Sequence, residues 1–446
     1  MRHAIGRWQG WTLVALLAAA LGGATACTRV VEAVSAEGCA AHPGAPGCSP
    51  TSWPTTGQGA NSDPWIVQHH DTITQMSPRV LVLNFSNSAT ADSARQTAER
   101  QIAAIAEGSR YHAYSDSSAP IFLNYQIARV VDLADHPIPP GWTQRSSTQL
   151  PVIPMPNVTP DSYPFDSQAL FSAPFSASYG FTDPANPARY LSLCELFEQG
   201  FINEVWIEDG EDGPRHAPYN AERKQIYDAQ NRPVPNTFDP CAGGGGCLPD
   251  VDCSVTVRIA HLNPQRGAGC DLDVRGWSLE SIPDTLPAFA AEASAFLNHD
   301  FRSRFAVGFN SWSNICDFAE TTCVTYPTPT SATGTYNGMP WTINPLIQGC
   351  GNTSFPPNAR ARYDWHQTTA QVQSRCEHFG LHDGVGGADA MEIYTSLRIN
   401  DIERVFGTDC GAGWQIYWRQ SVPGLGNKAT TTTGLPMRNW WPLLFY

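Results

Sequence analysis

Basic residues are scarce in this sequence of 446 residues. There are 27 Lys and Arg against 41 Asp and Glu, which gives a formal net charge of −14 at pH 7. A chain with this excess of negative charge repels polyanions. The composition therefore argues against nucleic acid and against an anionic membrane surface as binding partners.

Several catalytic and metal-binding signatures are also missing. No two cysteines have CxxC spacing, so the sequence contains no structural zinc motif. The patterns HExxH and GxSxG and a Cys-His protease pattern are absent as well. The glycine run in CAGGGGC, residues 241–247, lacks the Lys-Ser/Thr that follows a phosphate-binding loop. The sequence therefore specifies no cofactor, and only calcium is kept open for a loop considered below.

The first residues have the layout of an export signal. An apolar run over 11–21 follows two arginines and is too short to span a bilayer. Residues 24–26, Ala-Thr-Ala, fit ordinary signal cleavage, and with Cys27 they form an imperfect lipobox in which Ala24 replaces the usual Leu. We expect a signal peptide over 1–26. Cys27 as a lipid anchor at the outer membrane or cell surface is preferred to simple secretion.

The cysteine count agrees with export. Of 13 cysteines, 12 remain if Cys27 carries lipid, and an oxidising compartment would let them form up to six disulfides. The short spacings favour local bridges between Cys39 and Cys48 and between Cys316 and Cys323. A few free buried thiols are the alternative.

Composition divides the chain into an arm and one large domain. Residues 27–77 are mostly small, polar and rich in Pro and Gly, which predicts a tether or disordered arm. Residues 78–446 are expected to form a single α/β domain with long insertions at about 136–187 and 210–253. In chain order, hydrophobic periodicity predicts strands at 79–84, 121–131, 203–208 and 254–262, and helices at 90–107, 189–199 and 285–298.

The alternation of strands and helices determines the expected fold class. It favours an α/β domain with a largely parallel sheet flanked by helices. The two insertions are expected to be long, disulfide-linked loops. The last hundred residues are irregular and aromatic, and we expect them to pack on the same core because no linker precedes them.

Three segments together resemble a loose group of secreted bacterial proteins of uncharacterised function. The segments are 258–280 (RIAHLNPQRGAGCDLDVRGWSLE), 349–359 (GCGNTSFPPNA) and 439–441 (NWW). The group shares a GFN-like strand end followed by a glycine turn and an acidic helix of the form E-x3-H-x2-E. It also shares a CGN-x-x-FPPNA segment and a C-terminal NWW, and residues 203–208 resemble its DEVW strand. The resemblance implies a topology and a candidate site, but no reaction.

The sequence departs from the group's pattern at the candidate site. Asp273 stands for the first acid of the helix and Glu280 matches the second, but Trp277 replaces the histidine. His261 stands where the group has glycine. Positions 273, 277 and 280 share one helix face, where an acid, a histidine and an acid would make a metal or acid/base trio. Because indole cannot ligate a metal, we expect that a histidine-dependent metal site has been lost.

Acidic residues at the ends of predicted strands are the candidate catalytic groups. Parallel α/β sheets bind ligands beyond the carboxyl ends of their strands, where Glu208 and Asp209 lie. These two could pair with Asp273 or Glu280 as a two-carboxylate site for glycosidic or related hydrolysis. The alternative is that Asp209 begins a simple turn with Gly210 and that Glu208 is solvated.

Polar residues of the strand-to-helix junction are the candidate substrate-binding groups. They are His261, Asn263 and Arg266, with Trp277 placed to stack against a sugar ring. Arg266 either binds a carboxylate or a sugar hydroxyl, or locks the turn by pairing with Asp271 or Asp273.

A second candidate binding segment surrounds the rigid pair Pro356-Pro357. Asn352, Asn358 and Asp364 offer oxygen ligands there, which suits calcium or a substrate-facing loop. A loop that only caps the core is the alternative.

These observations favour an exported protein whose status as an enzyme stays open. The preferred hypothesis is a hydrolase-like protein that acts on extracellular glycan through strand-end acidic residues. The alternative is a non-catalytic lipoprotein that binds glycan or an envelope component and keeps a degenerate active site.

Overall fold

The computed structural model describes most of the chain. The described residues are 51–54, 63–136, 139–144, 148–159, 163–210, 220–293, 322–336, 339–431 and 433–446. The expected signal peptide and lipid anchor at Cys27 lie outside them, as do Cys39, Cys48 and Cys316. Among the described residues, no helix combines the length and the hydropathy needed to cross a membrane.

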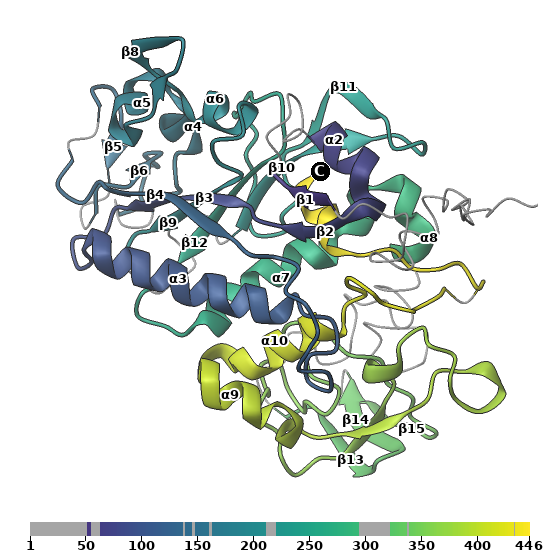
Figure 1. The fold of residues 1–446 in the computed structure, drawn as a ribbon. Coiled ribbons are helices and arrows are strands. Elements are labelled where there is room, and N and C mark those ends of the chain that lie inside the picture. The colour runs from purple at the N-terminus through teal and green to yellow at the C-terminus, as the bar shows by residue number, and fades with distance from the viewer. Residues whose placement is uncertain are drawn as a thin grey trace, which may run out of the picture.

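A six-stranded sheet forms the centre of the molecule, with strand order β11-β10-β12-β9-β3-β4 (Figure 1). Strands β12, β9, β3 and β4 run parallel to one another, and β10 pairs antiparallel with both of its neighbours, β12 and β11. Within this sheet β10 therefore runs against the direction of the other five strands. Their bounds are β3 Arg79–Asn84, β4 Gln126–Asp132, β9 Glu204–Glu208, β10 Asn220–Tyr227, β11 Pro233–Asp239 and β12 Val257–Leu262.

The expectation of a largely parallel sheet needs correction, because the sheet is mixed. The segment expected as a loop insertion, 210–253, supplies the reversed strand β10 and the edge strand β11 that pairs with it. Strand β10 escaped prediction because it carries buried charges, Glu222 and Lys224, where a buried strand ordinarily carries apolar residues. The α/β class itself holds.

Side-chain alternation along the strands builds two cores, one on each face of the sheet. In β3, Val80 and Val82 join one core, and Leu81 and Leu83 join the other. Helices α3 (Ala91–Gly108) and α7 (Ala268–Thr285) cover the first face, and α10 (Ala412–Ser421) packs against both of these helices (Figure 1). The second face is covered by α4 (Ser167–Phe171), α5 (Ala173–Tyr179) and α6 (Leu193–Glu198).

Ordered structure begins earlier than Arg79. Residues 63–77 were expected within the arm, but they contain α2 (Asp63–His69) and β2 (Ile73–Met76), and β2 pairs with β1 (Thr51–Trp53). Trp53, Ile66 and Met76 are buried in the first core. Their apolar side chains are few and separated by polar residues, which explains the weak signal in the sequence.

The C-terminal region adds a small sheet and then returns to the central one. Lys224 Nζ donates to the carbonyl of Leu443 over 2.9 Å, and Arg258 donates to the carbonyl of Leu444 over 2.6 Å. His70 lies 3.0 Å from the hydroxyl of Tyr446.

The other elements are β5 Thr143–Gln144, β6 Pro151–Val152, β7 Thr182–Asp183, β8 Asn186–Tyr190, α8 Ala290–Ala293, β13 Val324–Thr328, β14 Ser331–Tyr336, β15 Met339–Ile343, β16 Val372–Ser374, β17 Glu392–Tyr394 and α9 Asn400–Phe406.

Every cysteine that the structure describes is disulfide-bonded. The pairs are Cys194–Cys253, Cys241–Cys247, Cys270–Cys410 and Cys350–Cys376, and Cys323 is bonded as well. Two of these bridges hold the 210–253 segment, as expected of a disulfide-linked insertion. The Cys270–Cys410 bridge instead joins the start of α7 to the C-terminal region.

Candidate active site

The candidate site lies where the direction of winding of the sheet reverses. After β3 the chain adds β4 on one side, and it later returns to add β9 on the other side of β3. Ligands in open α/β sheets bind beyond the carboxyl ends of strands at such a reversal. Here these ends carry Asn84, Asp132, Glu208 and His261, and the amide of Phe85 donates to the carbonyl of Glu208 over 2.7 Å.

Glu208 is the most unusual side chain of this cluster. The residue is fully buried, yet neither carboxylate oxygen has a hydrogen-bond partner in the part of the chain that the structure describes. Burial raises the pKa of Glu208 to about 7, and the charges of Asp209 and Asp271 act in the same direction against the opposing effect of His261. An unsatisfied buried carboxyl is costly, so its presence points to a purpose other than stability.

The next residue, Asp209, forms an ion pair with His261. The Nε2 of His261 donates to Oδ1 of Asp209 over 2.8 Å, and both side chains are buried. Burial alone lowers the pKa of His261, but the hydrogen bond and charge of Asp209, with Asp271 and Glu208 nearby, outweigh it and raise that pKa. The imidazole is therefore held toward its charged form.

Glycine at position 210 makes this arrangement possible. Gly210 has a φ of +87°, and a Cβ there would collide with the hydroxyl of Ser86. The carbonyl of Gly210 accepts from Nε2 of Gln265 over 2.8 Å. These contacts fix the chain directly after Asp209.

Asp271 completes the cluster from the first turn of α7. It is buried, and one of its oxygens accepts the amide of Asn263 over 3.2 Å. Burial raises the pKa of Asp271 to about 6, against the opposing charges of His261 and Arg275. The site thus gathers three carboxyl groups around one imidazole.

Two predicted catalytic residues lie elsewhere. Asp273 accepts from Gln415 of α10 over 3.2 Å, and Glu280 accepts the amide of Thr353 over 3.3 Å. Positions 271 and 273 are about 200° apart around a helix, so Asp271 faces the strand ends and Asp273 faces α10. Burial and the charge of Glu280 raise the pKa of Asp273 to about 6. Trp277 is half-buried on the helix between them.

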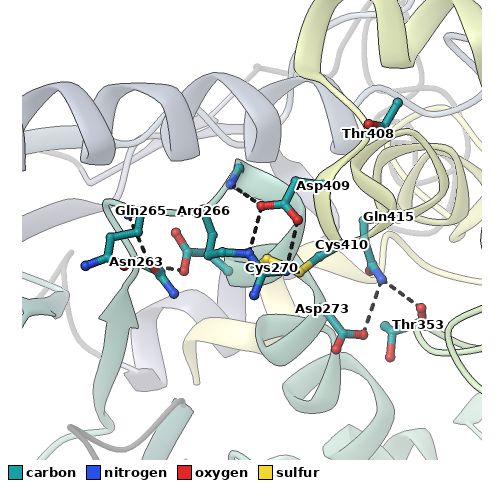
Figure 2. The surroundings of a disulfide bond; sticks show 12 residues. Asn263, Gln265, Arg266, Cys270, Asp273, Thr353, Thr408, Asp409, Cys410 and Gln415 are labelled. Atoms are coloured by element: carbon teal, nitrogen blue, oxygen red, sulfur yellow. Dashed lines mark hydrogen bonds and ion pairs between the residues drawn. A yellow bond between two sulfur atoms is a disulfide. The ribbon is translucent and has the colours of Figure 1, made fainter. Parts of the chain in front are cut away.

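Arg266 pairs with a residue that sequence reasoning did not suggest. Its Nε and one terminal nitrogen each lie 2.9 Å from an oxygen of Asp409, where Asp271 or Asp273 was expected (Figure 2). The amide of Gly267 donates to the same carboxylate over 2.8 Å. A Cβ at Gly269 would collide with the backbone of residues 409–412, so this glycine permits the close approach of the two segments.

In the second candidate segment, around Pro356-Pro357, the polar side chains bond to other residues of the protein. Asn358 is fully buried and donates to the carbonyls of Gln367 and Ala370. Asn352 accepts the amide of Ser354, and Asp364 accepts the amide of Arg360. The indoles of Trp414 and Trp418 donate to carbonyls of residues 351–352. These contacts agree with a loop that caps the core.

One group of potential metal ligands occurs within the described ranges. It comprises Cys270, Asp409 and Cys410, whose ligand atoms lie within 4.8 Å of one another. The two sulfur atoms are bonded to each other, so they are not thiolate ligands in this state.

Sequence reasoning placed Glu208, Asp209, His261 and Asn263 at the strand ends, and the structure brings them together there. It missed Asp271 as a member. The sequence shows an acidic residue shortly after the glycine turn, but the face of the helix on which it lies depends on the residue at which the helix begins, Ala268 in the structure. Asp409 gave no signal, since 143 residues separate it from Arg266.

Neither a family model nor a curated protein matches this chain.

Proposed function

We propose that this chain is an exported hydrolase that cleaves extracellular glycan by general acid–base catalysis, with Glu208 as the proton donor. One observation carries the proposal: a buried carboxyl group, without a hydrogen-bond partner among the described residues, has a pKa near 7 at the strand-end position where this fold class binds ligands.

The neighbouring groups supply the complementary roles. With a pKa of about 6, Asp271 is mostly ionised at neutral pH, while Glu208 with a pKa of about 7 keeps much of its proton. Two carboxyl groups in different protonation states are what glycosidic hydrolysis requires, one to protonate the leaving oxygen and one to serve as base or nucleophile. Asp209 raises the pKa of His261 and so favours the charged imidazolium, whose positive charge opposes the repulsion between the carboxylates.

Glycan is favoured as the substrate class because this chemistry needs only carboxyl groups. Ester and peptide hydrolysis by nucleophilic catalysis would instead call for an activated Ser or Cys, and every described cysteine is in a disulfide. The disulfides also suit an oxidising compartment. Export and anchoring through Cys27 are part of this proposal, and the intact mass of membrane-extracted protein would reveal a diacylglyceryl group on that residue.

The test compares Glu208, at the end of β9, with Asp273, a buried acid of α7 that contacts α10. Purified protein is incubated with a panel of polysaccharides, and new reducing ends are measured. We expect Glu208→Gln to reduce turnover by about a hundredfold or more. The matched control is Asp273→Asn, which changes a carboxyl of similar burial that contacts Gln415 and should leave turnover within about threefold.

Two results would contradict the assignment. Full activity of Glu208→Gln would remove Glu208 from the chemistry. Loss of activity in Asp273→Asn with retention in Glu208→Gln would move the site to the face of α7 that contacts α10.

A second candidate is a non-catalytic protein that binds glycan or an envelope component. The observation that favours it is that Arg266, Asp273 and Glu280, which match or stand in for the polar positions of the resembled group, are bonded to other parts of the chain. Saturable binding to one polysaccharide without any release of reducing ends would select this candidate.

A further inference from the structure

The Cys270–Cys410 disulfide differs from the other described bridges in its surroundings. Cys350 and Cys376 are fully buried, and in the Cys194–Cys253 bridge Cys194 is partly exposed but Cys253 is almost fully buried. Cys241 and Cys247 are exposed but close a loop of only six residues in sequence separation. Cys270 and Cys410 are partly exposed, and they join segments 140 residues apart.

An ion pair of Arg266 and Asp409 lies beside this bridge. A terminal nitrogen of Arg266 lies 3.2 Å from Sγ of Cys410 and 2.9 Å from Oδ1 of Asp409 (Figure 2). The hydrogen bonds of Arg266 hold the pKa of Asp409 below its usual range, so this carboxylate stays ionised beside the sulfur atoms. One cation and one anion thus act on the bridge in opposite directions.

Cys270, the other half of the bridge, has a different source of stabilisation for its thiolate. It lies in the first turn of α7, an 18-residue helix whose first amides carry partial positive charge. A helix N-terminus and a neighbouring guanidinium both lower the pKa of a thiol and make it a better leaving group.

We propose that Cys270–Cys410 is a site of thiol–disulfide exchange with small or protein dithiols. A thiolate of the dithiol attacks Sγ of Cys410, the bond between the two sulfur atoms breaks, and Cys270 leaves as a thiolate at the start of α7. The second thiol of the reagent then attacks the mixed disulfide and releases the Cys410 thiolate beside Arg266. Two electrons pass from the dithiol, which becomes a disulfide, to the protein.

The exchange has a structural consequence next to the strand-end cluster. Asp271 follows Cys270 directly, and its carboxylate accepts the amide of Asn263. Opening the bridge removes the covalent link that fixes the first turn of α7 to residues 409–412. This consequence concerns the position of Asp271 and holds whether or not the cluster is catalytic.

The experiment uses dithiothreitol as the reductant and alkylation with mass spectrometry as the readout for each cysteine. In the wild-type chain, Cys270 and Cys410 should be labelled well before Cys350 and Cys376. Two variants, Arg266→Gln and Asp409→Asn, each remove the same ion pair but leave opposite charges beside the bridge. The Cys241–Cys247 bridge serves as the internal control for the reagent.

We expect Arg266→Gln to slow reduction of the bridge by about threefold or more and Asp409→Asn to accelerate it by a similar factor. If loss of the ion pair merely exposed the bridge, both variants would be reduced faster. Equal rates in both variants, a change of the same sign, or labelling of Cys270 and Cys410 no earlier than the buried pair would overturn the proposal.

Discussion

Two glutamates on strand β9 show how differently one protein treats the same buried side chain. Glu204 and Glu208 are both fully buried and lie four residues apart, so both point to the same face of the sheet. Glu204 accepts from Tyr125, Trp206, Arg258 and Arg275 over 2.6 to 3.1 Å. Glu208 has no such partner within the described residues.

Their proton affinities diverge accordingly. Burial alone would raise the pKa of Glu204, but the charges of Arg258 and Arg275 and the hydrogen bonds outweigh it, and the net shift is downward. At Glu208 burial is not compensated, and the pKa rises to about 7. The pairing of a buried acid, rather than its depth, therefore separates a structural carboxylate from a candidate proton donor.

The largest effect on stability is expected from removing a charged partner of the buried Glu204. Arg258→Met would leave Glu204 and Glu222 without their shared guanidinium, which bonds to both over 2.8 Å. We expect a loss of about 3–5 kcal/mol in the free energy of unfolding, because two buried carboxylates each lose a charged partner, and Arg275 and Lys224 remain as their other cations. Urea unfolding followed by circular dichroism measures it. A loss below about 1 kcal/mol would show that the network is not the source of stability we assign to it.

At Glu208, which lacks such partners, we expect a smaller effect on stability, and of opposite sign. The folded-state pKa of Glu208 lies above its ordinary value of 4.5, at about 7. The protonated carboxyl therefore stabilises the fold at pH values below 4.5, and this contribution is lost as pH rises through 7. Glu208→Gln cannot lose a proton. Its stability relative to the wild type should rise by about 2 kcal/mol between pH 4.5 and pH 8, allowing for partial solvent screening.

Urea unfolding of both chains at the two pH values tests this expectation. An unchanged difference between the chains would mean that Glu208 keeps its ordinary proton affinity in the folded state. The contrast with Glu204 would then disappear.

The smallest effect on stability is expected from removing the partly exposed ion pair of Arg266 and Asp409. The side chains of Arg266 and Asp409 are 36% and 40% exposed, so water screens their attraction. Arg266→Met should lower the free energy of unfolding by less than about 1 kcal/mol in the same urea assay. A loss as large as that of Arg258→Met would show that burial is not what distinguishes the two ion pairs.

Local patterns in the sequence were enough to predict the elements that rely on apolar side chains. Strands β3, β9 and β12 and helix α3 lie where hydrophobic runs and helical spacing predicted them. Helix α6 occupies only part of the range predicted for it, because residues 186–190 form β8 instead. Residues beyond 293 in the last predicted helix lie outside the described part of the chain.

The missed features depend on partners far away in sequence. Strand β10 is stable with Glu222 and Lys224 inside because Arg258 and the carbonyls of residues 443–444 satisfy these charges. No local pattern contains that information. At the candidate site, the strand-end rule identified Glu208 and Asp209, whereas the choice between Asp271 and Asp273 required the rotational phase of a helix whose first residue was not fixed by the sequence.

The return of residues 443–446 to the central sheet has a consequence for the order in which the chain can fold. Lys224 and Arg258 find their carbonyl partners 219 and 186 residues later, and the Tyr446 that contacts His70 is 376 residues away from it. During synthesis, the strands that carry these charges leave the ribosome long before their partners exist. The charges cannot become buried without penalty in that interval, so the sheet centre can reach its final packing only after synthesis has passed residue 444. Contacts of such long sequence separation also predict slow folding of the complete chain, because the closure of large loops must precede the interactions that stabilise them.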